Sequence, residues 1–438
     1  SFLSINENEV SDTEAETLNV IPDSQHVLIP GSDFRAVDRT VSLFNGDHVT
    51  SQSTFANKHR DRMLVVTQTV TSVNHTIAQK RSITGNGAWN GRTLQEAVAM
   101  EYGAGSPLPN VTMGSLGFRA DGDDDSVPPE FRAEPVPAPE RWPLSLDGVA
   151  GVENHPDREV VELARTLRND RLDPESAFWG SFQLSERLQR WRTQREEGLP
   201  QIETAELLAK LNFGLPSADL PDFDPADLAA LQSAFGYLDA DPLQSQAALA
   251  YLLLKHGISN AVTLSPNWGL IAHPESGMAP GNPVVLNPPL SFDYSHTQHR
   301  TTQAIMWQRM LDTIDSLHDL LDDAEHPQCP GESLMDHTLI YLATDFGRTK
   351  THPAGATEWG SGHELNNGSL IVSSLTPGNT VLGGVEPTTG MTFGWNPSNG
   401  NDLPEEVTPE GTVYAGILQA LDVDTAGSGL PAVPVMSA

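Results

Sequence analysis

One stretch of the sequence decides the fold, and it reads Thr338-Leu339-Ile340-Tyr341-Leu342-Ala343-Thr344-Asp345-Phe346-Gly347-Arg348-Thr349. Its first half is a short apolar run, which predicts a strand buried in a parallel sheet. Asp345 and Arg348 follow that strand directly. Because α/β folds bind ligands at the carboxyl ends of parallel strands, we expect Asp345 to hold a metal ion and Arg348 to bind an oxyanion. The alternative is a plain ion pair between these two side chains.

Further buried strands are expected on the N-terminal and C-terminal sides of this stretch. The run Met63-Leu64-Val65-Val66 is apolar and bounded by charges. Shorter apolar runs lie at 111–113, 261–264 and 370–372. After the first strand, Thr93 and Glu96 form the pattern of a capping box, which predicts the start of a helix. This strand–helix–strand order predicts an α/β fold with a mostly parallel sheet flanked by helices.

The chain divides by composition into four parts. Residues 1–118 and 258–438 carry the α/β pattern, and residues 119–155 form an acidic, proline-rich loop. Residues 156–257 predict a helical block, because apolar side chains recur there at helical spacing. Within the last part, a long helix is expected from about 295 to 323.

The acidic loop contains a run of aspartates at 121–125 that resembles the start of a calcium-binding loop. Ser126 stands where such loops need glycine, and no glutamate occupies the twelfth position. A solvated acidic loop is therefore the preferred interpretation of this segment.

The net charge of the chain is −33, with 58 Asp and Glu residues against 25 Lys and Arg residues. A surface this negative repels phosphate backbones, so we expect no nucleic-acid partner. The same composition suits a soluble extracellular protein or a protein from a salt-rich environment. We expect no transmembrane segment, because no run of about 18 apolar residues is present.

Cys329 is the single cysteine, which excludes a disulfide bond within the chain. The sequence begins at Ser1 rather than at methionine, and this predicts that an N-terminal segment was removed through secretion or another cleavage. The expected location is therefore secreted, periplasmic or extracellular.

A second candidate site is the stretch Asp293-Tyr294-Ser295-His296-Thr297-Gln298-His299. Spacings of three would put Asp293, His296 and His299 on one side of the first turn of the long helix. A carboxylate and imidazoles so placed can bind a zinc-like divalent ion. The alternative is that Asp293 only caps the helix and that the two histidines are ordinary surface groups.

A third candidate is Gly360-Ser361-Gly362-His363-Glu364, where small neighbours would let His363 approach a metal ion closely. His352 lies nearby in the sequence and is another candidate. Motifs of several other classes are missing: the serine-hydrolase elbow, the phosphate-binding loop of nucleotide hydrolases, the zinc-protease helix and paired C-x-x-C. Cys329 lies in Gln328-Cys329-Pro330-Gly331, which differs from the cysteine signature of sulfatases.

The block Asp345-Phe346-Gly347-Arg348-Thr349, followed by Gly362-His363 and by the strand at 370–372, resembles a known family. It is similar to secreted bacterial proteins of family 1501 of domains of unknown function, which are grouped with the alkaline phosphatase and sulfatase superfamily. Residues 60–66, His75 and Gly91-Arg92-Thr93-Leu94 also resemble the early region of that family. The resemblance covers most of residues 55–120 and 258–385.

The resemblance implies an alkaline-phosphatase-like fold with metal ligands at the carboxyl ends of the strands. Matched by position, the implied metal ligands are Asp293, His296, Asp345 and His363, and His299 is added from its spacing alone. The nucleophile should follow the early strand, where Ser72 and His75 are candidate catalytic residues together with Arg348. Because Phe346 replaces the histidine that serves a second metal position, a single divalent ion (Zn, Mg or Ca) or an empty site is expected rather than two ions.

Two functions follow from these observations as hypotheses. The first is a secreted, metal-dependent hydrolase of phosphoric or sulfuric esters with a degenerate site. The second is a non-catalytic structural or filament protein on the same fold, which self-assembles or binds a partner chain at the cell surface. A carbohydrate-binding role, suggested by Trp89, Trp142 and Trp359, is a weaker third reading because tryptophans more often lie in the core.

Overall fold

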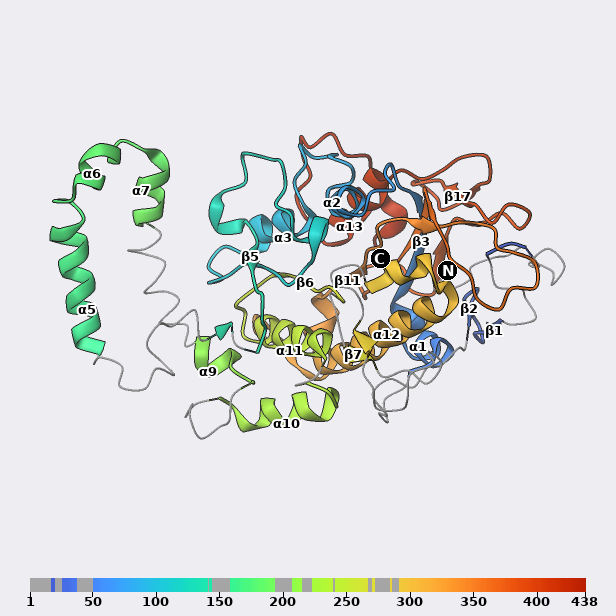
Figure 1. Ribbon diagram of the computed structural model, residues 1–438, viewed down its shortest axis with the longest axis horizontal. Coiled ribbons are helices and arrows are strands. Elements are labelled where there is room, and N and C mark those ends of the chain that lie inside the picture. Colours follow the sequence, from blue (N-terminus) through green and yellow to red (C-terminus); the bar gives the residue numbers. More distant parts are fainter. Residues whose placement is uncertain are drawn as a thin grey trace. The chain divides into compact units, whose positions relative to one another are not determined.

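The computed structural model describes residues 17–19, 26–37, 50–140, 142–143, 158–193, 207–214, 223–238, 241–266, 270–271, 284–285 and 291–438 (Figure 1). The chain forms two compact units, one made of residues 1–136 and 231–438 and the other of residues 137–230. Each unit is described by itself below.

The largest sheet of the first unit has four strands in the order β11-β14-β3-β15. The strands are β11 (Ile340–Leu342), β14 (Asn366–Val372), β3 (Met63–Thr69) and β15 (Thr380–Leu382). β14 pairs antiparallel with both β11 and β3, whereas β15 pairs parallel with β3. Because both flank β14 in antiparallel pairing, β11 and β3 run in the same direction and end at the same edge of the sheet.

A second sheet of three parallel strands has the order β5-β4-β6. These strands are β5 (Glu134–Pro135), β4 (Asn110–Thr112) and β6 (Ala261–Thr263). The remaining described strands form small antiparallel sheets: β1 (Val27–Leu28) with β2 (Arg35–Ala36), β7 (Leu270–Ile271) with β8 (Val284–Val285), β9 (Glu325–His326) with β10 (Cys329–Ser333), β12 (Gly347–Arg348) with β13 (His363–Glu364), and β17 (Thr392–Trp395) between β16 (Gly384–Val385) and β18 (Asp402–Leu403).

Helices lie on both sides of β3, with α2, α3 and α13 on one side and α11 and α12 on the other (Figure 1). The α-helices of this unit are α1 (Gln52–His59), α2 (His75–Thr84), α3 (Leu94–Tyr102), α11 (Pro242–Lys255), α12 (His299–Asp323) and α13 (Glu410–Ala420). Short 3₁₀ turns are η3 (Arg60–Arg62), η4 (Leu116–Arg119), η5 (Pro129–Phe131), η9 (Ser291–His296), η10 (Met335–His337) and η11 (Pro434–Met436). The capping box predicted at Thr93 and Glu96 is confirmed at the start of α3.

The main core lies between the four-stranded sheet and α13. Leu64 and Ile371 from the sheet pack with Leu418 from α13, and all three side chains are fully buried. The core also holds two polar aromatic side chains, and each finds a backbone partner. Trp395 Nε1 donates to the Thr67 carbonyl over 3.0 Å, and the Tyr414 hydroxyl donates to the Arg92 carbonyl over 3.0 Å. These bonds remove the cost of burying an unsatisfied donor.

Helices α11 and α12 are joined by a fully buried ion pair between Asp241 and Arg309. Arg309 Nε donates to Asp241 Oδ2 over 2.9 Å, and its Nη2 donates to Asp241 Oδ1. Asp241 is also the N-cap of α11, since its Oδ1 accepts a hydrogen bond from the Leu243 amide over 2.9 Å. The same carboxylate therefore caps α11 and neutralises a buried arginine.

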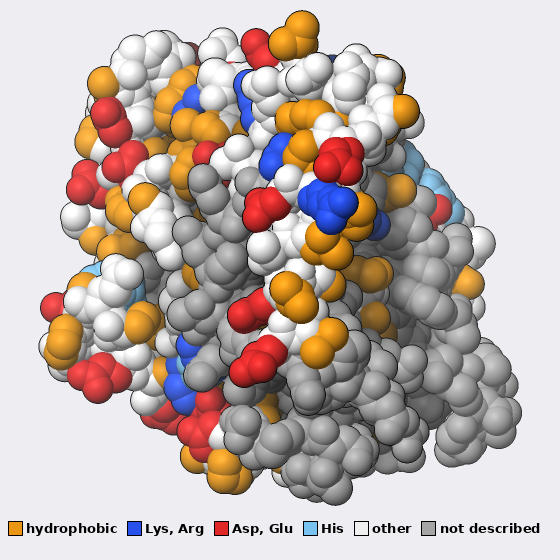
Figure 2. Space-filling model, turned by 90° about the vertical axis from the view of Figure 1, so that its left-hand side faces the viewer, with side chains coloured by type: hydrophobic (Ala, Val, Ile, Leu, Met, Phe, Trp, Pro, Cys, Tyr) orange, Lys and Arg blue, Asp and Glu red, His pale blue; other side chains and the backbone are white. Residues whose placement is uncertain are grey.

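The second unit is helical in its described part. It contains α5 (Arg158–Leu167), the π-helical turn η6 (Arg168–Leu172), α6 (Ala177–Phe182), α7 (Glu186–Thr193) and α9 (Leu207–Leu211). α10 (Pro225–Ala234) crosses the boundary at residue 230. Large apolar side chains are exposed along α5 to α7, namely Val160, Leu163, Leu167, Leu172, Phe178, Phe182, Leu184 and Trp191. On the face shown in Figure 2, hydrophobic side chains lie among scattered acidic and basic ones.

The predicted mixture of helices and strands is confirmed as a mixed α/β fold, but the mostly parallel sheet was only partly correct. The sheet β5-β4-β6 is parallel, whereas two of the three pairings in the four-stranded sheet are antiparallel. The reason is that β14 returns from the loop after β11 and inserts between β11 and β3. α11 belongs to the first unit rather than to the helical one that contains α5 to α7. None of the described helices combines the length and the apolar character needed to cross a membrane.

Candidate metal centre

Four side chains converge in the first unit: His75, Asp293, His296 and His363. Each offers one possible ligand atom, and these atoms all lie within 4.8 Å of one another. Their side chains are partly open to solvent, with exposed fractions of 16% for His75 and 42% for His296. An ion in bulk solvent could therefore reach the cluster.

The sheet topology explains how His75 reaches this point. β3 and β11 end at the same edge, and α2 begins with His75 six residues after the end of β3. Asn74 is the N-cap of α2, since its side chain accepts a hydrogen bond from the Ile77 amide over 3.2 Å. The cap fixes the backbone at the start of α2. The side chain of His75, the first helical residue, therefore points toward Asp345, which follows β11.

Asp293 and His296 come from the 3₁₀ turn η9. Side chains three residues apart are eclipsed in a 3₁₀ turn, so both point to the same side. His296 Nε2 lies 2.9 Å from Asp293 Oδ1, and His75 Nε2 lies 3.2 Å from the same oxygen. The carboxylate oxygen of Asp293 therefore faces two imidazole nitrogens at once.

His363 is placed by the two-stranded ladder of β12 and β13. In its register His363 lies opposite Arg348, and Gly347 lies opposite Glu364. His363 Nε2 lies 2.9 Å from His296 Nε2, and the two rings are 4.7 Å apart between centroids. His363 thus brings a third imidazole to the cluster, beside His296 and His75.

Hydrogen bonds fix which nitrogen of two histidines faces the cluster. His75 Nδ1 donates to Asp345 Oδ2 over 2.6 Å, and His363 Nδ1 donates to the Val73 carbonyl over 2.8 Å. A carboxylate and a carbonyl can only accept, so both Nδ1 atoms carry the proton. Each Nε2 is then left to face the centre of the cluster, as in histidines that bind metal ions.

The charges around the cluster act on its histidines in opposite directions. For His75, burial alone would lower the pKa, but the hydrogen bond to Asp345 and the charges of Asp345 and Asp293 raise it above its usual value. For His363, burial and the positive charge of Arg348 lower the pKa, against the opposing effect of the Val73 carbonyl. Burial also lowers the pKa of Arg348, while Asp345 and Asp293 oppose this shift.

The donor set fits a zinc ion. Tetrahedral zinc with bonds of about 2.0–2.1 Å to nitrogen and oxygen separates its ligand atoms by about 3.3 Å. The three pairs of facing atoms in the cluster are 2.9, 2.9 and 3.2 Å apart. Three imidazole nitrogens and one carboxylate oxygen also match the ligand types that zinc prefers, whereas Mg²⁺ and Ca²⁺ prefer oxygen ligands.

The other residues selected from the sequence take different places. Asp345 is not one of the four clustered residues, but its Oδ2 accepts the hydrogen bond from His75 Nδ1, on the side of the ring away from the cluster. Its Oδ1 accepts a hydrogen bond from the Phe346 amide over 2.9 Å. Ser72 accepts a hydrogen bond from the Asn74 amide over 3.1 Å, in the turn before α2. Arg348 lines the same cavity as His75 and Asp345.

His299 lies outside the described cluster. Its Nε2 is 3.1 Å from Asn19 Nδ2, and its ring packs near Trp359 with 5.8 Å between centroids. Burial, together with the charge of Arg348, lowers the pKa of His299 to about 3. The predicted spacing fails because η9 ends at His296 and α12 begins at His299, so the two histidines do not share one continuous helix.

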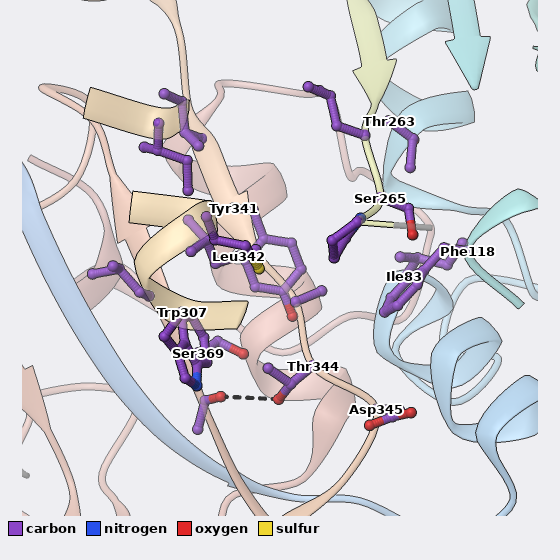
Figure 3. Close-up of a pocket in the computed structure, with 18 of the residues that line it drawn as sticks. Ile83, Phe118, Thr263, Ser265, Trp307, Tyr341, Leu342, Thr344, Asp345 and Ser369 are labelled. Carbon is purple, nitrogen blue, oxygen red and sulfur yellow. Dashed lines mark hydrogen bonds between the residues drawn. The ribbon is translucent and has the colours of Figure 1, made fainter. Parts of the chain in front are cut away.

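A cavity of about 1280 Å³ adjoins the cluster. His75, Asp293, Asp345 and Arg348 belong to its lining. Figure 3 shows Asp345 at one edge of this space, with the apolar side chains Ile83, Phe118, Trp307, Tyr341 and Leu342 around it. The cavity therefore joins a charged, histidine-rich end to an apolar interior.

The acidic loop and the tryptophans carry no site of their own in the described structure. Asp124 is buried and receives two hydrogen bonds from Arg92, of 2.8 and 3.0 Å, while Asp123 pairs with Lys80 over 2.6 Å. Asp124 is thus not a solvated surface group as predicted. Trp142 is 5% exposed, and Trp359 stacks on His352 at 4.2 Å, so the expected exposed platform for a sugar is not supported at either.

No family model, no curated protein and no solved structure matches this chain. The geometry of the described residues is therefore the basis for the functional argument.

Proposed function

We propose that the chain is a metal-dependent hydrolase of phosphoric or sulfuric esters, built on an alkaline-phosphatase-like fold with a single metal position. One observation carries the proposal: the Nε2 atoms of three histidines and one oxygen of Asp293 converge within 4.8 Å beside a large cavity. The ligands would be His75, Asp293, His296 and His363, and zinc suits them better than Mg²⁺ or Ca²⁺.

The residues around these ligands support a built site rather than a chance cluster. Asp345 and the Val73 carbonyl hold the Nδ1 atoms of His75 and His363. Gln79 reinforces Asp345 from α2, with its Nε2 lying 3.4 Å from Asp345 Oδ2. Such outer hydrogen bonds orient ligating imidazoles and raise their basicity. Asp345, which sequence analysis proposed as a ligand, is better assigned as the orienting group of His75.

When bound, a zinc ion would supply a Lewis acid that polarises an ester oxygen and lowers the pKa of a bound water molecule. The chain itself contributes binding and orientation. Arg348 is placed to bind the oxyanion of a phosphate or sulfate ester, because a guanidinium matches two such oxygens at once. The apolar part of the cavity is suited to the organic group of the ester, so aryl esters are the preferred substrates of this proposal.

We assign the attack on the ester to water rather than to Ser72. The Ser72 hydroxyl accepts the Asn74 amide, and Ser72 is not among the described residues that line the cavity. Hydrolysis then breaks the bond between phosphorus or sulfur and the ester oxygen, with water supplying the new oxygen and the proton of the released alcohol. In this assignment His75 is a ligand and not a general base.

The proposal includes a location outside the cell, whether secreted, periplasmic or at the surface. The acidic composition and the single cysteine are consistent with an extracellular chain that does not rely on disulfides. Nucleic acid is not a proposed partner, since a chain with a net charge of −33 repels the negatively charged phosphate backbone.

The decisive experiment measures metal content and turnover together. The protein is purified without metal-affinity steps, its metals are quantified, and hydrolysis of an aryl phosphate and an aryl sulfate is followed with and without added zinc. We expect at least one zinc per chain and a zinc-dependent release of the phenol. A protein that takes up no zinc and releases no phenol at any pH contradicts the proposal.

A second candidate function is self-assembly as a non-catalytic surface or filament protein. Eight large apolar side chains are exposed along α5 to α7. Residues 158–193 carry seven arginines against six acidic residues, a net charge of +1 in a chain of −33. The arginines of this segment would attract the acidic surface of a second copy of the chain. Sedimentation of the wild type beside Leu163→Ser and Phe178→Ser tests it, since a monomeric wild type contradicts assembly.

A further inference from the structure

A second group of side chains that could hold a metal ion lies within the twelve residues from His326 to His337, between His296 and His363 in the sequence. Cys329, Glu332 and His337 each offer a ligand atom, and these atoms lie within 4.8 Å of one another. Cys329 belongs to β10, Glu332 follows it on the same strand, and His337 ends the turn η10. Thiolates, imidazoles and carboxylates are the three types of side-chain ligand that bind zinc in proteins.

The hairpin of β9 and β10 explains why these side chains meet. In its register Cys329 lies opposite His326, and the ladder is interrupted between Cys329 and Ser333. Residues directly opposite one another in an antiparallel pair present their side chains on the same face, and the irregularity re-aims the residues that follow. Glu332 lies in the irregular segment, and its Oε2 contacts His337 Nε2.

His326 supports the cluster without belonging to it. Its ring packs on the ring of His337, with 4.6 Å between the centroids. Its Nδ1 accepts the backbone amide of Gln328 over 3.2 Å, which fixes the orientation of the ring. The packing restricts the orientation of the His337 ring, in the way that supporting groups orient ligating histidines.

The surroundings suit an ion that arrives from solvent. The side chains of His337 and Glu332 are 37% and 57% exposed, and Cys329 is half-buried. The geometry points to a second metal site, in which Cys329, Glu332 and His337 bind a zinc-like divalent transition ion and a water molecule takes the fourth position. Sulfur in the ligand set favours zinc and its neighbours over Mg²⁺ and Ca²⁺.

The single cysteine of the chain makes this site separately observable. Cobalt(II) replaces zinc and gives an intense thiolate-to-cobalt band in the near ultraviolet only when sulfur is a ligand. The cluster of His75, Asp293, His296 and His363 contains no sulfur and cannot give this band. The experiment therefore titrates the reduced, metal-free protein with cobalt(II) and follows the near-ultraviolet absorption, followed by displacement with zinc.

We expect the band to saturate once no more than two equivalents have been added, because the histidine cluster also takes up cobalt, and to vanish on adding zinc. Glu332→Gln changes an exposed side chain and so preserves the fold. It should weaken the cobalt affinity measured from this band at least tenfold. His337→Gln should do the same, while His352→Gln, a histidine outside both groups, should leave the titration unchanged. A wild type without the band, or a Glu332→Gln variant that binds as tightly as the wild type, overturns the assignment.

A measurement on the wild type alone gives an independent check. A thiolate bound to zinc reacts slowly with alkylating reagents. Zinc should slow the alkylation of Cys329, detected by mass spectrometry, at least tenfold, and a chelator should restore the original rate. Equal rates with and without zinc overturn the assignment, whatever the histidine cluster binds.

Discussion

His75 Nδ1 and Asp345 Oδ2 are joined by a hydrogen bond of 2.6 Å between the first residue of α2 and the loop after β11. The two residues are 270 positions apart in the sequence. The bond exists because β3 and β11 run in the same direction on either side of β14 and deliver their following residues to one edge of the sheet. It links the architecture of the sheet directly to the orientation of a proposed metal ligand.

Removing this bond should weaken metal binding without removing a ligand. Asp345→Asn keeps the shape of the side chain but loses the charge that orients His75. We expect zinc affinity to fall about 10–100-fold, measured by competition with a chromophoric chelator. Asp121→Asn, at an exposed aspartate, is the matched control and should leave the affinity unchanged. Equal affinities in the wild type and Asp345→Asn would argue against the orienting role.

The two histidines predicted from the same sequence motif should behave differently. His296→Ala removes a proposed ligand and should lower the zinc content by about one ion per chain. His299→Ala removes a side chain that contacts Asn19 and Trp359, so we expect it to keep the zinc and lose some stability. Metal analysis and thermal unfolding of both variants check this. Loss of zinc in His299→Ala with retention in His296→Ala would reverse the assignment.

Arg348 is expected to act on the substrate and not on the metal ion. Arg348→Gln should lower kcat/KM for an aryl phosphate or sulfate about 100-fold, which is typical of losing one oxyanion-binding group. Its zinc content should remain that of the wild type. Arg119→Gln, at an exposed arginine, serves as the control. If zinc is lost together with activity in Arg348→Gln, the guanidinium has a structural role instead.

Asp312 should make the stability of the fold depend on pH. Burial raises the pKa of Asp312 to about 7, although hydrogen bonds from the Thr50 amide and from Gln308 oppose the shift. The unfolded chain has the ordinary, lower pKa, so the favourable contribution of the protonated acid is complete below about pH 4 and is lost as the pH rises to about 7.

Asp312→Asn keeps an oxygen that can accept both hydrogen bonds and removes the ionisation. We expect it to raise the free energy of unfolding by about 1–3 kcal/mol near pH 8 and to have little effect near pH 4. Urea denaturation of both proteins at the two pH values measures this. Asp319→Asn, at an exposed partner of Lys58, should show no such pH dependence. The same difference at both pH values would exclude titration of Asp312 as the cause.

The buried ion pair between Asp241 and Arg309 should be a large contributor to the first unit. Asp241→Asn can still cap α11 through its oxygen but leaves Arg309 with its charge uncompensated in the core. We expect a loss of about 3–5 kcal/mol in the free energy of unfolding, measured by denaturant titration. Asp224→Asn, whose parent side chain accepts the Ala226 amide at an exposed helix start, should cost about 1 kcal/mol or less. Similar costs for the two variants would assign the role of Asp241 to capping alone.

The elements that sequence analysis placed well are those whose signals are local. The apolar run at 63–66 became β3, the run at 338–343 contains β11, and the capping box at Thr93 starts α3. In each case burial on both faces or a side-chain bond to the nearby backbone determines the structure. Such signals need no knowledge of the rest of the fold.

The composition of the histidine cluster was less accessible from the sequence. His75 was expected as a catalytic residue because it follows a strand, and nothing in its immediate neighbours indicates that its Nε2 faces Asp293. That contact depends on the antiparallel insertion of β14, which the sequence pattern did not reveal. The group at Cys329, Glu332 and His337 was not predicted, because these residues meet only through the irregular ladder of β9 and β10 and the turn η10 that follows it.

The two groups of candidate ligands differ in how much of the chain each requires. The histidine cluster draws on residues 75, 293, 296 and 363, so it cannot be complete until most of the nascent polypeptide has left the ribosome. Cys329, Glu332 and His337 span nine residues and could capture an ion while the remainder is still being synthesised. If zinc is scarce during biosynthesis, the group at Cys329, Glu332 and His337 would be affected first, and the histidine cluster only after the chain has folded. The sequence separation of the ligands therefore determines the order in which the two groups bind zinc.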